Sequence, residues 1–151
     1  MDQGQSSPIA FPSSSPESVQ QPLGYVLYRS IARPGLDEDD LNVILTKARA
    51  WNQSVGLTGC LHHEGGMFFQ WLEGPRSELF RLLDRIVDDS RHFNVTVLDQ
   101  GLIDSRLFAA WEMKFTDREA ASILEWLAER RDKTNEENPK QVIEFLRTIK
   151  A

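Results

Sequence analysis

Short apolar runs separated by turn-forming residues predict that much of the chain is β-strand. Five such runs lie at Tyr25–Tyr28, Gly56–His63, Met67–Leu72, Asn94–Leu98 and Ala110–Phe115. The first run is aromatic and β-branched, which favours extended backbone, and Pro34-Gly35 follows it. The second and third runs flank Glu64-Gly65-Gly66, so this part of the chain is typical of a β-hairpin.

Two other segments carry apolar residues at the spacing of a helix. In the first, one stripe consists of Leu41, Ile44, Leu45 and Ala48. Asp37 is a suitable N-cap, Glu38–Asp40 places negative charge in the first turn, and we expect the helix to end near Asn52. The second helix follows Gly74-Pro75, and its apolar side consists of Leu79, Leu82, Leu83, Ile86 and Val87.

The order of these elements is β-α-β-β-α-β with one further strand. This order predicts an α+β fold of the ferredoxin-like type, in which two helices pack on one face of an antiparallel-rich sheet. In such a sheet, alternate residues of each strand point to opposite faces. The assignment of faces therefore decides which side chains meet the helices.

The two ends of the chain differ from this central part. Residues 1–23 are rich in Ser, Gln and Pro and predict a disordered leader. After the last strand, Thr116–Glu119 has the pattern of a capping box that opens a helix through Ile123, Leu124 and Leu127. Asn138-Pro139 begins a last helix through Val142, Leu146 and Ile149. We expect a leader at 1–23, a central domain at 24–116 and a helical extension at 117–151.

Composition excludes several classes of function. The 151 residues carry a net charge of −6 and a pI near 5.1, which disfavours a nucleic-acid partner. No apolar run approaches the roughly 18–20 residues that cross a bilayer, and the N-terminus lacks the pattern of a secretory signal. Cys60 is the only cysteine, so no intramolecular disulfide forms, and a cytoplasmic location is expected.

Strand alternation places two polar side chains in an apolar layer. Tyr28 shares a face with Val26, and Gln70 shares one with Phe68 and Leu72. A buried polar group without a partner costs about 1–3 kcal/mol, so Tyr28 and Gln70 should bond to each other or to a ligand. The alternative is that Tyr28 and Gln70 bond only to each other and bind no ligand. In the last strand, Trp111, Met113 and Phe115 are expected to share one face.

Five motifs occur in a fixed order along the chain. They are Tyr28-Arg29-Ser30, Asn52 with Gly56-Leu57-Thr58-Gly59, Phe68-Phe69-Gln70-Trp71-Leu72-Glu73-Gly74, Arg91-His92, and Phe108-Ala109-Ala110-Trp111-Glu112-Met113. Together they resemble the BLUF family of blue-light photoreceptors, over about Tyr25 to Phe115. The resemblance implies non-covalent FAD, with its isoalloxazine ring between the two helices.

The resemblance also implies roles for single residues. Tyr28 matches the donor of an electron and a proton, and Gln70 matches the amide between that tyrosine and the flavin. The remaining positions match side chains that hold the cofactor or change place on illumination. Asn52 matches the contact to the pyrimidine edge of the flavin, and Arg91 and His92 match the contacts to O2 and to the ribityl or phosphate part. The apolar wall is matched by Ile44, Leu61 and Phe68. The switch strand is matched by Trp111 and Met113.

For several other residues we weigh a packing or capping role against a role at the site. Asn52 could be a simple C-cap. Trp51 departs from common family usage, in which a smaller or polar residue is frequent at this position. An indole there could cover the flavin edge, donate an electron, or pack at the pocket rim. His62 and His63 point to opposite faces of a strand and cannot both bind one metal, so no metal site is expected. Cys60 is expected to pack in the interior.

Only about 35 residues follow the predicted sheet, so we expect a sensor without its own catalytic domain. With Tyr28 facing the flavin, Leu27, Phe69 and Trp71 must face the other side of the sheet, where we expect the C-terminal helices to cover them only in part. A second protomer or an effector protein would then share this face. The alternatives are a light-independent small-molecule module, an acylphosphatase-like enzyme, for which no phosphate loop follows Tyr28, and an RNA-binding sheet, which the charge disfavours.

Overall fold

The computed structural model describes residues 22–90, 92–111, 113–130 and 139–149. The elements are β1 (Leu23–Ala32), α1 (Glu38–Val55), β2 (Thr58–Glu64), β3 (Met67–Pro75), α2 (Arg76–Asp88), β4 (His92–Leu102), β5 (Lys114–Asp117), α3 (Ile123–Arg130) and α4 (Pro139–Thr148). None of the helices within these ranges has both the length and the apolar character that crossing a bilayer requires. The predicted leader, apart from its last two residues, and the Asn138 N-cap lie outside the described residues.

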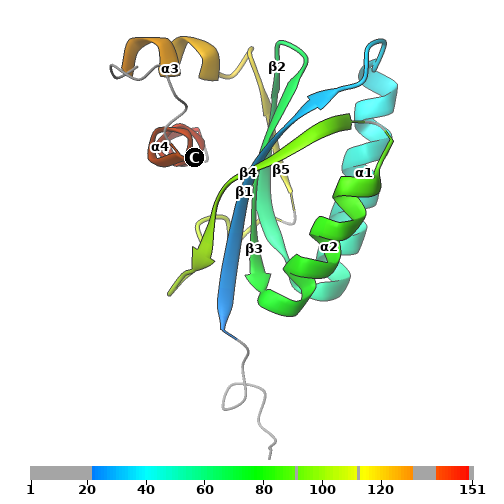
Figure 1. The fold of residues 1–151 in the computed structure, drawn as a ribbon, viewed down its shortest axis with the longest axis vertical. Helices are drawn as coiled ribbons and strands as arrows, with labels where there is room; N and C mark the ends of the chain where they lie inside the picture. Colours follow the sequence, from blue (N-terminus) through cyan, green and yellow to red (C-terminus); the bar gives the residue numbers. More distant parts are fainter. Residues whose placement is uncertain (1–21, 91, 112, 131–138, 150–151) are drawn as a thin grey trace, which may run out of the picture.

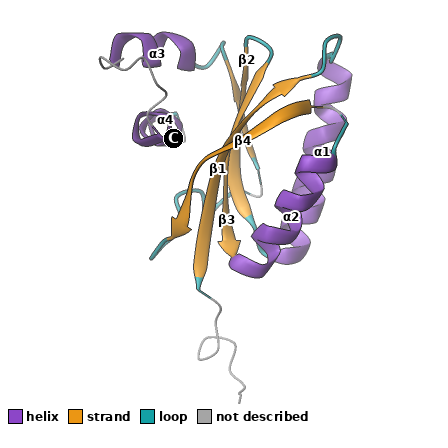
Figure 2. Cartoon of the chain, in the orientation of Figure 1, coloured by secondary structure: helices purple, strands orange, loops and turns teal. Residues whose placement is uncertain are grey.

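Five strands form one sheet in the order β4-β1-β3-β2-β5. β1 is antiparallel to both β3 and β4, β2 is antiparallel to β3, and β5 is parallel to β2. The helices α1 and α2 lie on one face of this sheet, and α3 and α4 lie on the other (Figures 1 and 2). The predicted α+β, ferredoxin-like arrangement is therefore confirmed.

The first helix begins as the sequence predicts but ends later. Asp37 caps it, since its carboxylate accepts the N–H of Asp40 at 2.8 Å and the Asp40 carboxylate accepts the N–H of Asp37 at 3.1 Å. The helix ends at Gly56, which adopts the left-handed conformation with φ of 77°. Asn52 therefore lies inside the last turn and is not the C-cap, so its buried side chain faces the interior.

Two predictions for the last strand and third helix are wrong. The strand begins at Lys114 and not at Ala110, because the chain turns before it, with the Trp111 N–H bonded to the Phe108 carbonyl at 2.9 Å. The predicted capping box at Thr116–Glu119 does not form, since β5 continues to Asp117. The α3 helix starts at Ile123, where the Ser122 hydroxyl accepts the Glu125 N–H at 3.2 Å.

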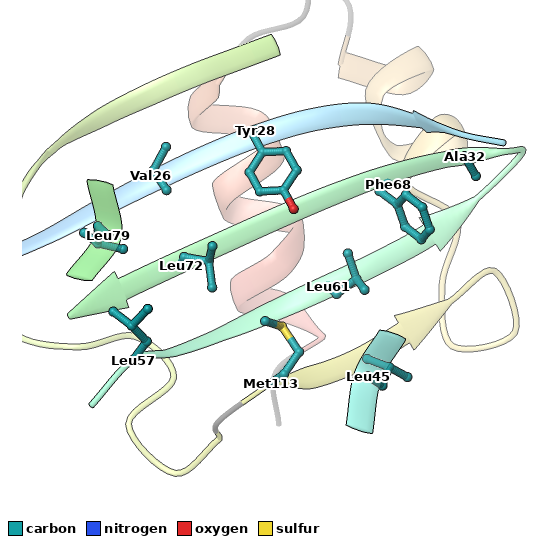
Figure 3. Packing of buried hydrophobic residues seen from close by; sticks show 10 residues of the cluster. All are labelled: Val26, Tyr28, Ala32, Leu45, Leu57, Leu61, Phe68, Leu72, Leu79 and Met113. Carbon is teal, nitrogen blue, oxygen red and sulfur yellow. The ribbon is translucent and has the colours of Figure 1, made fainter. Parts of the chain in front are cut away.

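Each face of the sheet has its own apolar core. On the side of α1 and α2, Val26, Tyr28, Leu61, Phe68 and Met113 are buried together, and Figure 3 shows them on one side of the strands. On the other side, the cluster consists of Leu27, Cys60, Phe69, Trp71, Phe108, Ile123, Val142, Phe145 and Leu146. The alternation along β1 and β3 therefore distributes side chains between two cores, as the strand period requires.

The expected apolar patch behind the site is not exposed. Leu27 and Phe69 have no exposed surface and Trp71 is 3% exposed, because α3, α4 and Phe108 pack over them. The prediction that the C-terminal helices cover this face only in part is therefore wrong for these three side chains. A partner is not needed to bury them.

Glu64, at the end of β2, joins the sheet to α3. Its buried carboxylate accepts the N–H of Ile123 at 2.8 Å and contacts His62 Nε2 at 2.9 Å. It also accepts a hydrogen bond from the Ser122 hydroxyl, and the Arg118 guanidinium lies 3.3 Å away. A negative charge at a helix N-terminus is favourable, so Glu64 fixes the start of α3 against the sheet.

The charge states of this pair follow from its surroundings. Burial opposes ionisation of Glu64, but hydrogen bonds from His62, Ser122 and the Ile123 N–H outweigh it and lower the pKa of Glu64 below its ordinary 4.5. Burial lowers the pKa of His62 below 6.5, although the nearby carboxylate acts in the opposite direction. At pH 7 a neutral His62 therefore donates from Nε2 to the ionised Glu64 and accepts at Nδ1 from the Thr116 hydroxyl, 2.8 Å away.

Replacing Glu64→Gln should lower the free energy of unfolding at pH 7 by about 1–3 kcal/mol, because a buried acceptor of several hydrogen bonds becomes an amide. Both proteins should lose stability below pH 6.5, since the pKa of His62 is lower in the folded state. The wild-type advantage is present above pH 4.5 and should shrink as the pH falls through the depressed pKa of Glu64. Urea unfolding at several pH values measures the difference in unfolding free energy between wild type and Glu64→Gln, and the exposed Glu129→Gln serves as the control. A constant difference at all pH values would contradict the assignment.

Candidate functional site

A cavity of about 220 Å³ lies between α1, α2 and the sheet face that carries Tyr28. Eight of the ten site residues predicted from the sequence line it: Tyr28, Ile44, Asn52, Leu61, Phe68, Gln70, His92 and Met113. Trp111 does not line it, and Arg91 lies outside the described residues. The structure therefore brings eight of the predicted residues together around one cavity.

The helical period brings the α1 residues to this cavity. Ile44, Ala48 and Trp51 follow one another at intervals of one helical turn, and all three line the cavity. The second helix supplies Leu82 and Arg85 in the same way. The two helices therefore contribute both apolar and charged side chains to the cavity.

A hydrogen bond between Tyr28 and Gln70 forms the floor of the cavity. The two residues face each other across the β1–β3 pair, and the Tyr28 hydroxyl donates to Gln70 Oε1. Gln70 Nε2 points to the Met113 sulfur at 3.3 Å. Both side chains are buried, at 3% and 6% exposure. The pair thus satisfies its hydrogen bonds internally while it lines the cavity.

The Tyr28 hydroxyl is held in its protonated form. Burial raises the pKa of Tyr28 far above its ordinary value of 10.0, and the negative charge of Asp89 at the cavity rim adds to this shift. A phenol in this setting does not lose a proton alone at neutral pH.

His92 is fixed by the protein at both ring nitrogens. Nε2 lies 2.7 Å from the Ile86 carbonyl, and Nδ1 lies 2.7 Å from the Ser30 hydroxyl. Because a carbonyl only accepts, Nε2 must carry the hydrogen, and Nδ1 then accepts from Ser30. His92 thus presents its ring, and no unused nitrogen, to the cavity.

Met113 and Trp111 occupy opposite environments. Met113 is 2% exposed and reaches the cavity, while Trp111 is 45% exposed and lies near Lys114 on the surface. The backbone around them is anchored, since Arg49 Nε donates to the Met113 carbonyl at 2.9 Å and the Gly59 N–H donates to the Trp111 carbonyl at 3.1 Å. The prediction that both side chains share one face is wrong, because the regular strand begins only at Lys114.

Cys60 lies away from the cavity. Its side chain is buried in the core on the opposite face of the sheet, beside Leu27 and Phe69. Burial raises the pKa of its thiol to about 12. The expectation of a packing role is therefore confirmed, and no described thiol reaches a ligand in the cavity.

Sequence analysis missed three residues of the cavity wall with ionisable groups. Lys47, Arg85 and Asp89 line the cavity, and so does Trp51, which is expected from the sequence at the flavin edge or the pocket rim. The helical spacing from Ile44 and from Leu82 could have found them. These residues line the cavity only because α1 and α2 lie side by side, and local sequence patterns do not predict how two helices are placed.

Several proteins of known function are similar to the central part of the chain. Subunit alpha of the photoactivated adenylate cyclase of Euglena gracilis is 34% identical over 102 residues, which is 68% of this chain and 10% of the cyclase subunit. The blue light- and temperature-regulated antirepressor BluF of Escherichia coli is 30% identical over 95 residues, which is 63% of this chain and 24% of BluF. The similarity therefore concerns one part of each of these longer proteins.

Two solved structures match over most of both chains. BlsA in its photo-activated state has a TM-score of 0.75 and 29% identity, and the match covers 85% of this chain and 94% of BlsA. The dark state of BlrB, a BLUF protein, has a TM-score of 0.74 and 32% identity, covering 86% of this chain and 96% of BlrB. These coverages extend the similarity beyond the sheet with its two covering helices.

The sequence model of the BLUF family, described as sensors of blue light using FAD, matches residues 23–114. The cavity suits such a cofactor, since it combines apolar walls at Ile44 and Leu61 with the amides of Asn52 and Gln70. The buried N–H of Trp51 also has no hydrogen-bond partner among the described residues, as expected for a donor that a ligand satisfies. The chain therefore belongs to the BLUF family, and it senses blue light with non-covalently bound FAD.

Proposed function

We propose that Tyr28 and Gln70 convert absorption of blue light into a changed pattern of hydrogen bonds. The observation that supports this is the buried bond from the Tyr28 hydroxyl to Gln70 Oε1 in the wall of the cavity. Bound FAD supplies the absorption of blue light and, once excited, a ring that accepts an electron and a proton. All further steps belong to the side chains of the protein.

Tyr28 gives up an electron and its hydroxyl proton together. The burial that raises its pKa prevents loss of the proton alone, so charge and proton must leave in a coupled step. The proton follows the hydrogen bond to Gln70 Oε1. When both return, Tyr28 is restored, and only the arrangement of the Gln70 amide differs.

Gln70 stores the change because an amide has a donor end and an acceptor end. Rotation reverses which end faces Tyr28, and tautomerisation reverses which end donates. With the present arrangement, Nε2 faces the Met113 sulfur at 3.3 Å, and thioether sulfur only accepts. A reversed amide turns an acceptor toward Met113 and removes this contact, which frees the Met113 side chain.

Removal of either side chain should abolish the response while FAD stays bound. In wild type, blue light should shift the flavin band modestly to the red, and the band should revert in the dark. Tyr28→Phe keeps the ring but lacks the hydroxyl, and Gln70→Leu lacks the amide that stores the change. Absorption spectra before and after illumination test both. A normal red shift in either variant removes that residue from its role, and a near-ultraviolet adduct band in wild type would contradict the mechanism.

We propose that Asn52 binds the pyrimidine edge of the flavin. Asn52 is 1% exposed, lies in the last turn of α1 and lines the cavity opposite the helix α2. An amide suits this edge, which alternates donors and acceptors. Ile44, Leu61 and Phe68 form the apolar wall. We assign Arg91 and His92 to the O2, ribityl or phosphate side, where His92 contributes its ring face because both ring nitrogens are already bonded.

Asn52→Ala should weaken FAD binding about tenfold, since polar atoms of the buried ring lose their protein partners. The red shift of the FAD that remains bound should be nearly unchanged. Titration of the flavin-free protein with FAD, followed by flavin fluorescence, measures the affinity. An unchanged dissociation constant would show that Asn52 acts only within its helix.

We propose that the signal leaves through Met113 and β5 to α3. The Met113 segment leads directly into β5, and β5 leads to the start of α3, which Glu64 holds against the sheet. The names of the similar cyclase and antirepressor indicate outputs other than light absorption in those proteins. This chain acts as a sensor without a catalytic step of its own, and its partner is an effector protein or a second copy.

Hydrogen exchange in the dark and in the light tests this route. Amides in β5 and α3 should exchange faster or slower in the light, and solution mass should report any change in association. Gln70→Leu is the matched control, because its bound FAD absorbs light without the amide that stores the change. No difference across residues 113–130 in wild type, with unchanged association, would exclude the route.

A further inference from the structure

Trp51 forms a bridge across the cavity between α1 and α2. Its indole lines the cavity, and the Arg85 guanidinium of α2 lies over the ring, 4.1 Å from the ring centroid. A cation over an aromatic face at this distance is a favourable contact that fixes the ring plane. The indole is therefore held in one orientation by a residue of the opposite helix.

The indole N–H of Trp51 has no acceptor within the described part of the chain. Nε1 is buried, and no hydrogen-bond partner for it is present among the described residues. The two other described tryptophans in the interior are satisfied, since Trp71 Nε1 donates to Glu73 at 2.9 Å and Trp126 Nε1 donates to the Gln141 carbonyl at 3.1 Å. Because buried donors in folded proteins are almost always bonded, this N–H points to an acceptor that the described residues do not supply.

The position of Trp51 identifies that acceptor. The cavity it lines is the one that holds Tyr28, Gln70 and Asn52, and the α1 residue next to Trp51 is Asn52 itself. Flavin offers acceptor oxygens on its ring carbonyls and along its ribityl chain. We propose that Trp51 Nε1 donates a hydrogen bond to an oxygen of the flavin ring or ribityl chain, and that Arg85 positions the indole for it. The inference rests on the proposed flavin site and adds a binding residue to it.

A purely packing role for Trp51 does not account for its buried indole N–H. A packing residue at this position would need only an apolar ring, which phenylalanine supplies. The indole adds a donor that is buried at a cost, and only a ligand in the cavity offsets it. The two roles therefore predict opposite effects of Trp51→Phe on the flavin-free protein.

The test compares Trp51→Phe with Trp126→Phe in the full chain. Trp51→Phe keeps a ring under Arg85 and removes only the N–H and part of the ring. It should raise the FAD dissociation constant about fivefold, the value of one neutral hydrogen bond. The unfolding midpoint of the flavin-free variant should be equal to or higher than that of wild type. Trp126→Phe removes a satisfied N–H on the far side of the sheet, so it should change FAD affinity less than about twofold and lower the midpoint.

The same titration with lumiflavin and riboflavin locates the acceptor. An equal loss with all three flavins places the oxygen on the ring, and a loss with riboflavin and FAD alone places it on the ribityl chain; both support the proposal. Unchanged affinity for FAD in Trp51→Phe, or a loss confined to FAD, overturns it. The red shift of bound FAD in Trp51→Phe should persist. Its persistence alongside unchanged affinity would overturn this inference while leaving the role of Tyr28 and Gln70 intact.

Discussion

The antiparallel pairing of β1 with β3 determines the chemistry of this protein. It places Tyr28 opposite Gln70, so that a hydroxyl and an amide meet within an apolar layer. Neither group could be buried alone without a large cost, and together they are satisfied. A slip of either strand by one residue would move its own side chain to the other face of the sheet and separate the pair. The long pairing from Leu23↔Pro75 to Ile31↔Met67 opposes such a shift.

Two further side chains of β3, Trp71 and Glu73, lie on the other face of the sheet, and Glu73 ties a loop to the sheet. Trp71 donates from Nε1 to the fully buried Glu73, whose carboxylate also accepts the backbone N–H groups of Leu107 and Phe108 at 2.7 and 2.8 Å. This loop leads to the segment that contains Met113. One short strand therefore carries both the amide beside the cavity and the carboxylate that anchors the approach to β5.

The two faces of the sheet are covered by different means. On the cavity side, α1 and α2 leave a space between them, and contacts such as the one from Arg85 to Trp51 span it. On the other side, α3 and α4 close over Leu27 and Phe69, and Glu64 holds the start of α3. The first arrangement admits a ligand, and the second makes the C-terminal helices part of the fold.

The sequence by itself determined the order of elements and the face on which Tyr28 and Gln70 lie, because strand and helix periods act over a few residues. It also located eight residues that line the cavity. Only the tertiary structure decided that Met113 enters the cavity while Trp111 stays outside, that α3 starts at Ser122 and Ile123, and that the reverse face is covered. These features depend on contacts between residues distant along the chain, such as Glu64 with Ile123. Local periodicity cannot predict such contacts.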